Sequence, residues 1–243
     1  MTILSKNNQK IKDIIKLKDK KYRDKSKLFL VEGYHLVNEA KEKGILVETL
    51  ELIDKNKFDN SIQVSPEILA SLTDTKTPQG IVGVCKISEN NSDIGSKVLV
   101  LDNLQDPGNV GTIIRTAKAF GFNDIIISNF DYFNPKVIRS SQGAFFKTNL
   151  YKTNNTRHEL INLKSQGYTI YSTILNTNAK QLNSVVVDDK KLVIVVGNEG
   201  NGISKEVQEV SDFGLYIPIE FESLNVAVAT GIVLNHFYND KKR

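Results

Sequence analysis

The chain has 243 residues, 40% hydrophobic and 25% charged, a composition typical of a globular protein that excludes disorder as a description of the whole chain. No apolar run approaches the ~20 residues that a membrane span needs, and the first ten residues lack the apolar core of a secretion signal. Cys85 is the single cysteine, which excludes an intramolecular disulfide framework, and we expect a cytoplasmic protein.

The positive charge is concentrated at the N-terminus. Residues 1–27 contain ten Lys or Arg and three Asp or Glu, a net charge of +7, so the rest of the chain carries a net −3. A basic stretch ahead of a nearly neutral body indicates contact with a polyanion, and nucleic acid is the leading candidate. A lysine-rich helix that is simply solvated is the alternative.

The first half of the chain predicts a small α/β domain. Isoleucines and a leucine spaced among lysines over 10–23 predict an amphipathic helix with a basic outer face. The following elements are a strand at 28–33, a helix to Lys43 ended by Gly44, a strand at 47–53, a short helix opened by Ser65-Pro66, and a strand at 81–87. The polar segment 88–97 predicts a linker, so we expect domains at 1–90 and 91–243.

The second half consists of short apolar, β-branched runs, most of them separated by helical stretches. The runs lie at 98–104, 124–128, 168–174, 192–197 and 215–219. This alternation predicts a mostly parallel sheet covered by helices on both faces. Ligands of such sheets bind at the carboxyl ends of the strands, so the turns after the strands are the candidate site.

The first of these turns lies in DNLQDPGNVGTIIRTAKAFG (102–121). Asp106-Pro107-Gly108 predicts the turn, and Asn109 is expected to cap the helix that follows. Gly111 and Arg115 are four residues apart and share a helical face, so the glycine leaves room for the arginine to reach a ligand. The arginine fork suits phosphate. An ordinary capped helix with a solvent-facing arginine is the alternative.

The second turn is rich in glycine and follows the run at 192–197. Gly197, Gly200 and Gly202 allow backbone groups to approach a ligand, and Ser204 is expected to cap the next helix. The order G-x-x-G-x-G matches neither the dinucleotide fingerprint nor the P-loop. Glu199 within the loop disfavours phosphate, and a structural glycine turn is the alternative.

The third turn follows a strand that we expect to end at Pro218. Ser223 or Asn225 is placed to cap or line the next helix. That helix, from Leu224 to about Asn239, is apolar nearly all round and predicts burial on more than one side, against the sheet and against a second subunit. The three histidines are scattered, and neither a metal-ligand spacing nor a G-x-S-x-G nucleophile motif is present.

In this order and at these separations, the three turns resemble the SpoU (TrmH-like) family of RNA 2′-O-ribose methyltransferases, within the knotted SPOUT superfamily. The matching residues are Asn109-Val110-Gly111 with Arg115-Thr116-Ala117, the loop from Gly197 to Ser204, and Ile217-Pro218-Ile219 with Ser223-Leu224-Asn225-Val226. LFLVEG and the run Thr77–Ile81 are similar to the substrate-binding domain of many members, which resembles an RNA-binding ribosomal-protein fold.

The resemblance implies a trefoil-knotted domain from 91 to 243, a homodimer formed through the last helix, and S-adenosylmethionine as methyl donor with no metal. It implies a catalytic set of Arg115, Asn109, Glu199, Ser223 and Asn225. The residues implied for donor binding are Thr173, Gly197, Asn198, Gly202, Ile217 and Leu224.

The expected reaction is methylation of a ribose 2′-hydroxyl in structured RNA, with ribosomal RNA ahead of transfer RNA. A guanidinium is a poor base at neutral pH, so we interpret Arg115 as a donor that stabilises the developing oxyanion and fixes a phosphate. The alternatives are a base methyltransferase on the same fold and an inactive RNA-binding protein. A nicotinamide oxidoreductase is disfavoured by the glycine order.

Overall fold

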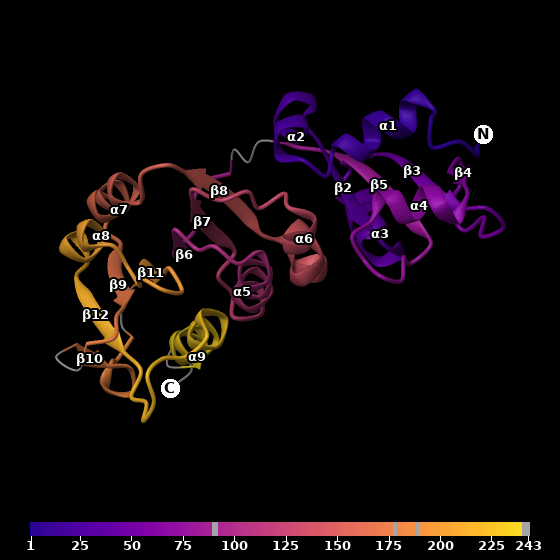
Figure 1. Ribbon diagram of the computed structural model, residues 1–243. Helices are drawn as coiled ribbons and strands as arrows, with labels where there is room; N and C mark the ends of the chain where they lie inside the picture. Colours follow the sequence, from indigo (N-terminus) through magenta and orange to yellow (C-terminus); the bar gives the residue numbers. More distant parts are fainter. Residues whose placement is uncertain (89–91, 177–178, 188–189, 240–243) are drawn as a thin grey trace. The chain divides into compact units, whose positions relative to one another are not determined.

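The computed structural model describes residues 1–88, 92–176, 179–187 and 190–239 (Figure 1). The chain forms two compact units. Unit 1 comprises Met1–Glu89 and Phe133–Phe146, and unit 2 comprises Asn90–Tyr132 and Lys147–Arg243. The sequence predicts a single division at residue 90, whereas the chain also contributes the later segment 133–146 to unit 1. Part of the predicted linker lies outside the described residues.

Unit 1 has a five-stranded mixed sheet in the order β1-β4-β3-β5-β2, in which β5 is antiparallel to both neighbours. Its elements are β1 (Thr2–Ile3), α1 (Gln9–Lys16), α2 (Lys20–Ser26), β2 (Leu28–Glu32), α3 (Tyr34–Glu42), β3 (Leu46–Leu52), β4 (Ile62–Val64), α4 (Pro66–Leu72), β5 (Ile81–Lys86) and α6 (Pro135–Ser141), with η1 (Gln142–Lys147) after α6. As predicted, Ser65 caps α4 by accepting a hydrogen bond from the backbone N–H of Ile68.

The single helix predicted over 10–23 is wrong, because the structure has two helices there. Asp19 interrupts the run by capping α2, where its side chain accepts from the Lys21 backbone N–H at 2.9 Å. The buried Arg23 donates to the carbonyls of Leu17 and Lys18, at 2.8 and 2.7 Å. A side chain thus satisfies carbonyls between the helices, which compensates for the break.

Aromatic packing explains why the segment 133–146 belongs to unit 1. The ring centroid of Phe29 on β2 lies 5.0 Å from that of Phe133 and 5.9 Å from that of Phe145. The Arg139 guanidinium lies 3.9 Å from the carboxylate of Glu32. Packing partners so distant along the chain leave no periodic signal in the sequence, so the single predicted division missed this segment.

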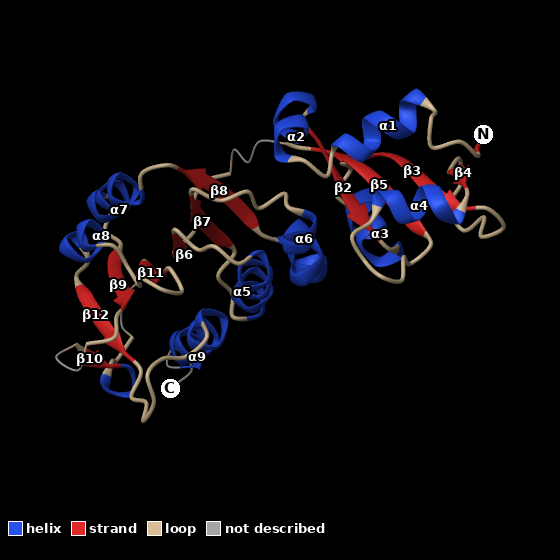
Figure 2. Ribbon diagram, viewed as in Figure 1, coloured by secondary structure: helices blue, strands red, loops and turns tan. Residues whose placement is uncertain are grey.

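Unit 2 has a seven-stranded sheet in the order β10-β12-β9-β11-β6-β7-β8, and all its pairings among described residues are parallel (Figure 2). Its elements are β6 (Lys97–Asp102), α5 (Pro107–Ala119), β7 (Asp124–Ser128), β8 (Asn149–Thr153), α7 (Thr156–Ser165), β9 (Thr169–Thr173), β10 (Lys180–Gln181), η2 (Leu182–Ser184), β11 (Leu192–Gly197), α8 (Lys205–Val210), β12 (Phe213–Tyr216) and α9 (Val226–Asn239). The predicted α/β class is confirmed; the knot stays a prediction.

Helices cover both faces of this sheet, as Figure 2 shows. One face packs against α7 and α8, through a buried cluster that includes Val98 and Val100 of β6 with Leu160 and Val207 of the helices. The other face is covered by α5 and α9, which pack on each other. The last strand ends at Tyr216 rather than at the predicted Pro218, and Tyr216 is paired with Gln181, the last residue of the neighbouring strand β10.

Candidate active site

A cavity of about 560 Å³ lies at the carboxyl ends of β9, β11 and β12 in unit 2. All six residues predicted to bind the donor line it: Thr173, Gly197, Asn198, Gly202, Ile217 and Leu224. Its volume is in the range of small-molecule sites. The strands therefore place the second and third sequence motifs around one space, although these motifs come from separate loops, and the first motif contributes no residue to the lining.

The loop that follows β11 closes on itself as a small hairpin. The backbone groups of Asn198 and Gly202 bond each other in both directions, at 3.0 and 2.9 Å. A Cβ on Gly197 would lie 2.4 Å from the carbonyl carbon of Gly202, so no other residue fits at this position without moving the backbone. Gly202 has a φ of 66°, which also favours glycine. These glycines let bare backbone line the cavity.

The walls of the cavity combine apolar side chains with polar backbone. Leu215, Ile217 and Leu224 are among the apolar lining residues, while the hairpin backbone and side chains such as Thr173 and Ser223 contribute polar groups. This mixture fits a molecule with a flat apolar ring and polar edges, such as the adenosine part of S-adenosylmethionine.

Glu199 connects the glycine loop to the turn of the first motif. Its carboxylate accepts from the backbone N–H groups of Gln105 and Asp106, at 3.1 and 3.2 Å, and from the Asn109 side-chain amide at 3.1 Å. Desolvation of the carboxylate opposes ionisation, but the hydrogen bonds from Asn109 and from backbone N–H groups outweigh it and lower the pKa of Glu199 below its ordinary value. The carboxylate therefore stays charged.

Asn109 does not cap α5, contrary to the sequence prediction. The cap is Asp106, which accepts from the Asn109 backbone N–H at 2.8 Å, with Pro107 in the first turn of the helix. The Asn109 side chain instead accepts from the Asn225 amide at 3.1 Å, and the Asn225 oxygen accepts from the Ala227 backbone N–H at 2.9 Å. Asn225 therefore caps α9, and the chain Glu199–Asn109–Asn225 joins all three motifs.

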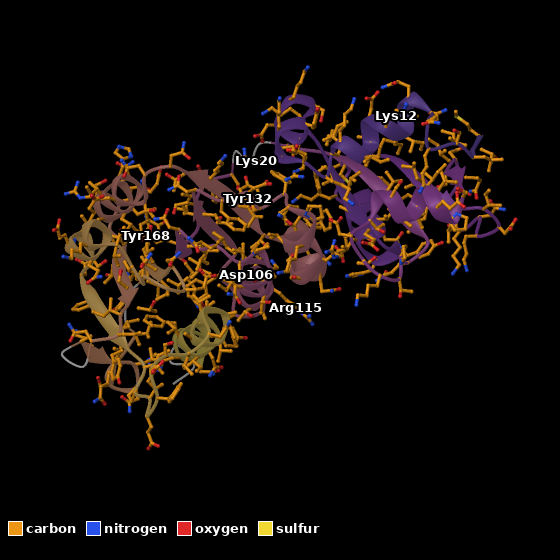
Figure 3. The ribbon with its side chains drawn as sticks, in the orientation of Figure 1. Lys12, Lys20, Asp106, Arg115, Tyr132 and Tyr168 are labelled. Carbon is orange, nitrogen blue, oxygen red and sulfur yellow. The ribbon has the colours of Figure 1, made fainter. Side chains whose placement is uncertain are left out.

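The remaining two predicted catalytic residues are both exposed. Ser223 lines the cavity, whereas Arg115 lies on α5 outside the cavity lining (Figure 3). Gly111 is buried, so it does not present open backbone over which Arg115 reaches a ligand, as the sequence analysis proposed.

Sequence reasoning missed two residues beside these motifs. Asp102 ends β6 almost fully buried and accepts from the Thr156 hydroxyl at 2.9 Å and the Ser204 backbone N–H at 3.2 Å. An aspartate that ends an apolar run is the signal for such an anchor. Asn103 follows it in a left-handed conformation, for which the sequence has no signal beyond the residue type. Among the described residues, no group of three His, Cys, Asp or Glu side chains is arranged to hold a metal ion.

Comparison with known proteins agrees with this geometry. Residues 96–235 match the SpoU rRNA Methylase family, and residues 8–83 match the MRM3-like substrate binding domain. The chain is 38% identical to the 23S rRNA (guanosine(2553)-2′-O)-methyltransferase RlmP of Bacillus subtilis, over 96% of this chain and 98% of that protein.

Two solved structures of similar sequence share the fold. A putative RNA methyltransferase of the TrmH family from Porphyromonas gingivalis is 30% identical with a TM-score of 0.85, over 96% of this chain and 98% of that one. The AdoMet-bound rRNA methyltransferase of Sinorhizobium meliloti is 27% identical with a TM-score of 0.86, over 98% and 97%.

A parallel α/β sheet with a small-molecule cavity at the carboxyl ends of its strands is a ligand-binding domain, and the family match assigns it to the methyltransferase class. The chain belongs to the SpoU rRNA methylase family. It is an RNA methyltransferase that uses S-adenosylmethionine as methyl donor, which confirms the predicted enzyme class and cofactor.

Proposed function

We propose that this chain methylates a ribose 2′-hydroxyl of ribosomal RNA in the cytoplasm, with the donor bound in the unit 2 cavity. The observation that carries the proposal is the chain of hydrogen bonds from Glu199 through Asn109 to Asn225, at the edge of that cavity. The 38% identity with a protein named as a 23S rRNA 2′-O-methyltransferase supports the choice of ribose and of ribosomal RNA.

In the reaction, the sulfur–carbon bond of the donor breaks, an oxygen–carbon bond forms, the electron pair of the broken bond stays on the sulfur of the S-adenosylhomocysteine that leaves, and the hydroxyl proton passes to water or to a phosphate of the RNA. S-adenosylmethionine supplies a methyl group that is already activated on a sulfonium, so the protein has to orient the acceptor and stabilise the charge that develops on its oxygen. The Asn109 amide, fixed between Glu199 and Asn225, keeps the three loops in one arrangement. Ser223 and Asn225 form the acceptor side of the cavity.

Arg115 is the residue we assign to the acceptor oxygen and the neighbouring phosphate. It is exposed on α5, and a protonated guanidinium donates hydrogen bonds to both groups. Because Arg115 does not line the cavity of its own chain, we propose that the RNA and a second subunit complete the site around it.

The second subunit is proposed to pack against α9. Val228 and Ile232 lie one turn apart on this helix and are 53% and 40% exposed, although Val233, Leu234 and Phe237 are buried in the same helix. A twofold contact would bury the exposed pair in both copies. Because α5 packs on α9, this contact would bring Arg115 close to the interface.

The RNA is proposed to bind unit 1 through α1 and α2. Four lysines of this region are paired with carboxylates, namely Lys10, Lys16, Lys18 and Lys20. Lys12, Lys21 and Lys25 are exposed, and the described residues give them no acidic partner. Unpaired cations on the surface are the groups that phosphates recruit. Figure 3 shows Lys12 on α1 and Lys20 on α2.

The product of the reaction tests the proposal. Ribosomal RNA from cells that lack the gene is incubated with the full-length protein and labelled S-adenosylmethionine, then digested to nucleosides for mass spectrometry. We expect the label on the ribose. Label on a base supports the alternative base methyltransferase, and RNA binding without label supports the inactive RNA-binding protein.

The RNA surface is tested separately by changing Lys12, Lys21 and Lys25 together to glutamine. We expect weaker binding and a smaller salt dependence, with the slope of log K against log salt reduced by about 2 to 3 for three lost phosphate contacts. The control is the matched triple change of Lys41, Lys43 and Lys55, which are also exposed in unit 1. Equal losses in the two variants contradict a specific α1–α2 surface.

A further inference from the structure

Three asparagines occupy equivalent places at the carboxyl edge of the unit 2 sheet. Asn198 follows β11, Asn103 follows β6, and Asn129 follows β7. These strands are adjacent and parallel, with Gly197 paired to Asp102 and Leu101 paired to Ile127. Asn198 lines the cavity, whereas Asn103 and Asn129 are exposed beside it, and the sequence predicts no role for either of them.

Hydrogen bonds connect the three asparagines into a row. The Asn198 side-chain amide donates to the Asn103 backbone carbonyl at 2.8 Å, and the Asn129 amide donates to the Asn103 side-chain oxygen at 2.8 Å. The backbone N–H of Asn129 donates to the carbonyl of Thr153, where β8 ends, at 3.1 Å. The row therefore runs across the ends of β11, β6, β7 and β8.

Asn103 is the centre of the row and has an uncommon backbone conformation. Its φ is 56°, in the left-handed region that few residues other than glycine and asparagine adopt readily. Its backbone N–H donates to the buried Ser128 hydroxyl at 2.9 Å, and its side-chain amide donates to Asp102 at 2.9 Å. Its carbonyl and side-chain oxygen also accept hydrogen bonds, so all four polar groups of Asn103 have a partner. These hydrogen bonds therefore fix one backbone conformation of Asn103, and in that conformation its carbonyl accepts from Asn198.

The row ends at the loop that lines the donor cavity. The Asn198 side-chain oxygen accepts from the backbone N–H groups of Gly200 and Asn201, at 2.9 and 3.0 Å. The oxygen of the Asn198 side chain therefore bonds the loop, and its NH2 group bonds Asn103. The left-handed conformation of Asn103 sets the direction of its carbonyl, and the position of the loop depends on that direction.

We infer that Asn103 is a positioning residue for the methyl donor, because its left-handed turn holds Asn198 and thereby fixes the loop 198–202 before the donor arrives. Asn129, which follows β7, stabilises this turn by donating a hydrogen bond to the Asn103 side chain. The inference rests on the proposed function, since it takes the cavity as the donor site. Less binding free energy is lost in ordering a loop that is already in place. Disordering this loop therefore weakens donor binding more than it slows the transfer step.

The test compares alanine and glycine at one position in the full-length protein. Asn103→Ala is expected to raise the Kd of S-adenosylmethionine, measured by calorimetry, at least tenfold, because alanine disfavours a φ of 56°. Asn103→Gly is expected to recover most of that loss, because glycine adopts this φ freely. In steady-state assays, KM for the donor rises in Asn103→Ala while kcat stays within about threefold.

A matched control separates positioning from general stability. Asn60 in unit 1 has a similar left-handed φ of 60°, and Asn60→Ala is expected to lower the melting temperature without changing the donor Kd. A donor Kd within twofold of wild type in Asn103→Ala overturns the inference, and so does a loss that Asn103→Gly fails to recover.

Asn198→Ala distinguishes this inference from the proposed donor site. If Asn198→Ala weakens donor binding and Asn103→Ala does not, the cavity binds the donor and only the role of Asn103 is wrong. If neither change affects the Kd, the cavity is not the donor site, and both proposals are wrong.

Discussion

The donor cavity and the α5 surface that carries Arg115 differ in how much of each a single chain completes. The cavity has its lining loops bonded to one another through Glu199, Asn109 and Asn225. Arg115 is exposed, and the described residues give it no hydrogen-bond or ion-pair partner. From this difference we expect the single chain to prepare donor binding by itself, and we propose that the RNA and a second copy complete the acceptor half of the site.

The sharpest test of this difference is Arg115→Ala. We expect methyl transfer to fall at least a hundredfold, because a donor to the developing oxyanion is lost, while the donor Kd stays within twofold. Single-turnover assays and calorimetry measure the two quantities. Arg157→Ala, an exposed arginine on α7, is the control and should keep full activity. Turnover within about tenfold of wild type, or ~1.4 kcal/mol in the barrier, shows that Arg115 is not catalytic.

The donor cavity is tested by adding one methyl group to the loop that follows β11. Gly197→Ala places a Cβ 2.4 Å from backbone atoms, so the hairpin must shift, and we expect the donor Kd to rise at least tenfold. In Gly200→Ala the nearest atom lies 3.6 Å away, which is ordinary contact, and binding should change little. Circular dichroism establishes that both variants are folded. Equal affinities in the two variants contradict the role of the hairpin.

The expected second copy is tested on α9. Light scattering of the wild-type protein at micromolar concentration should give about twice the 27.2 kDa mass of the chain. Ile232→Glu should give the monomer and weaken methyl transfer, because a buried unpaired charge opposes the contact. The control is Ile161→Glu on α7, since Ile161 is 41% exposed and Ile232 is 40% exposed. A wild-type mass near 27 kDa contradicts the dimer.

The smallest expected effect concerns Glu199 and pH. Its pKa is lowered in the folded chain, so its contribution to stability is complete above the unfolded value of about 4.3 and is lost as the pH falls through the lower folded value. We therefore expect the wild type to lose more stability below about pH 4 than Glu199→Gln does, as measured by urea unfolding. Glu209→Gln, an exposed carboxylate on α8, should retain the wild-type pH dependence. Identical pH profiles for wild type and Glu199→Gln contradict the expectation that hydrogen bonds to the charged Glu199 carboxylate stabilise the fold.

Local chemistry explains most of what the sequence predicted correctly. Ser65 before Pro66 defines a helix start, and Gly44 follows a helix end with a φ of 72°. The apolar β-branched runs became buried parallel strands, such as Leu192–Gly197. The prediction that Asn109 caps α5 was wrong because several residues of the turn suit capping. Pro107 lies in the first turn of the helix, which makes Asp106 the cap.

By itself, the sequence determined the fold class, the longer apolar strands and the three motifs, because each is encoded by neighbouring residues, but it did not predict β1, β4, β8 or β10. The tertiary structure decided which side chains meet. The Asn109 amide reaches Glu199 and Asn225 across 90 and 116 residues of chain, and the phenylalanines of segment 133–146 pack on β2 of unit 1. Such contacts follow from the order of the strands and from the burial of apolar surface, both of which depend on the whole chain and leave no local periodicity.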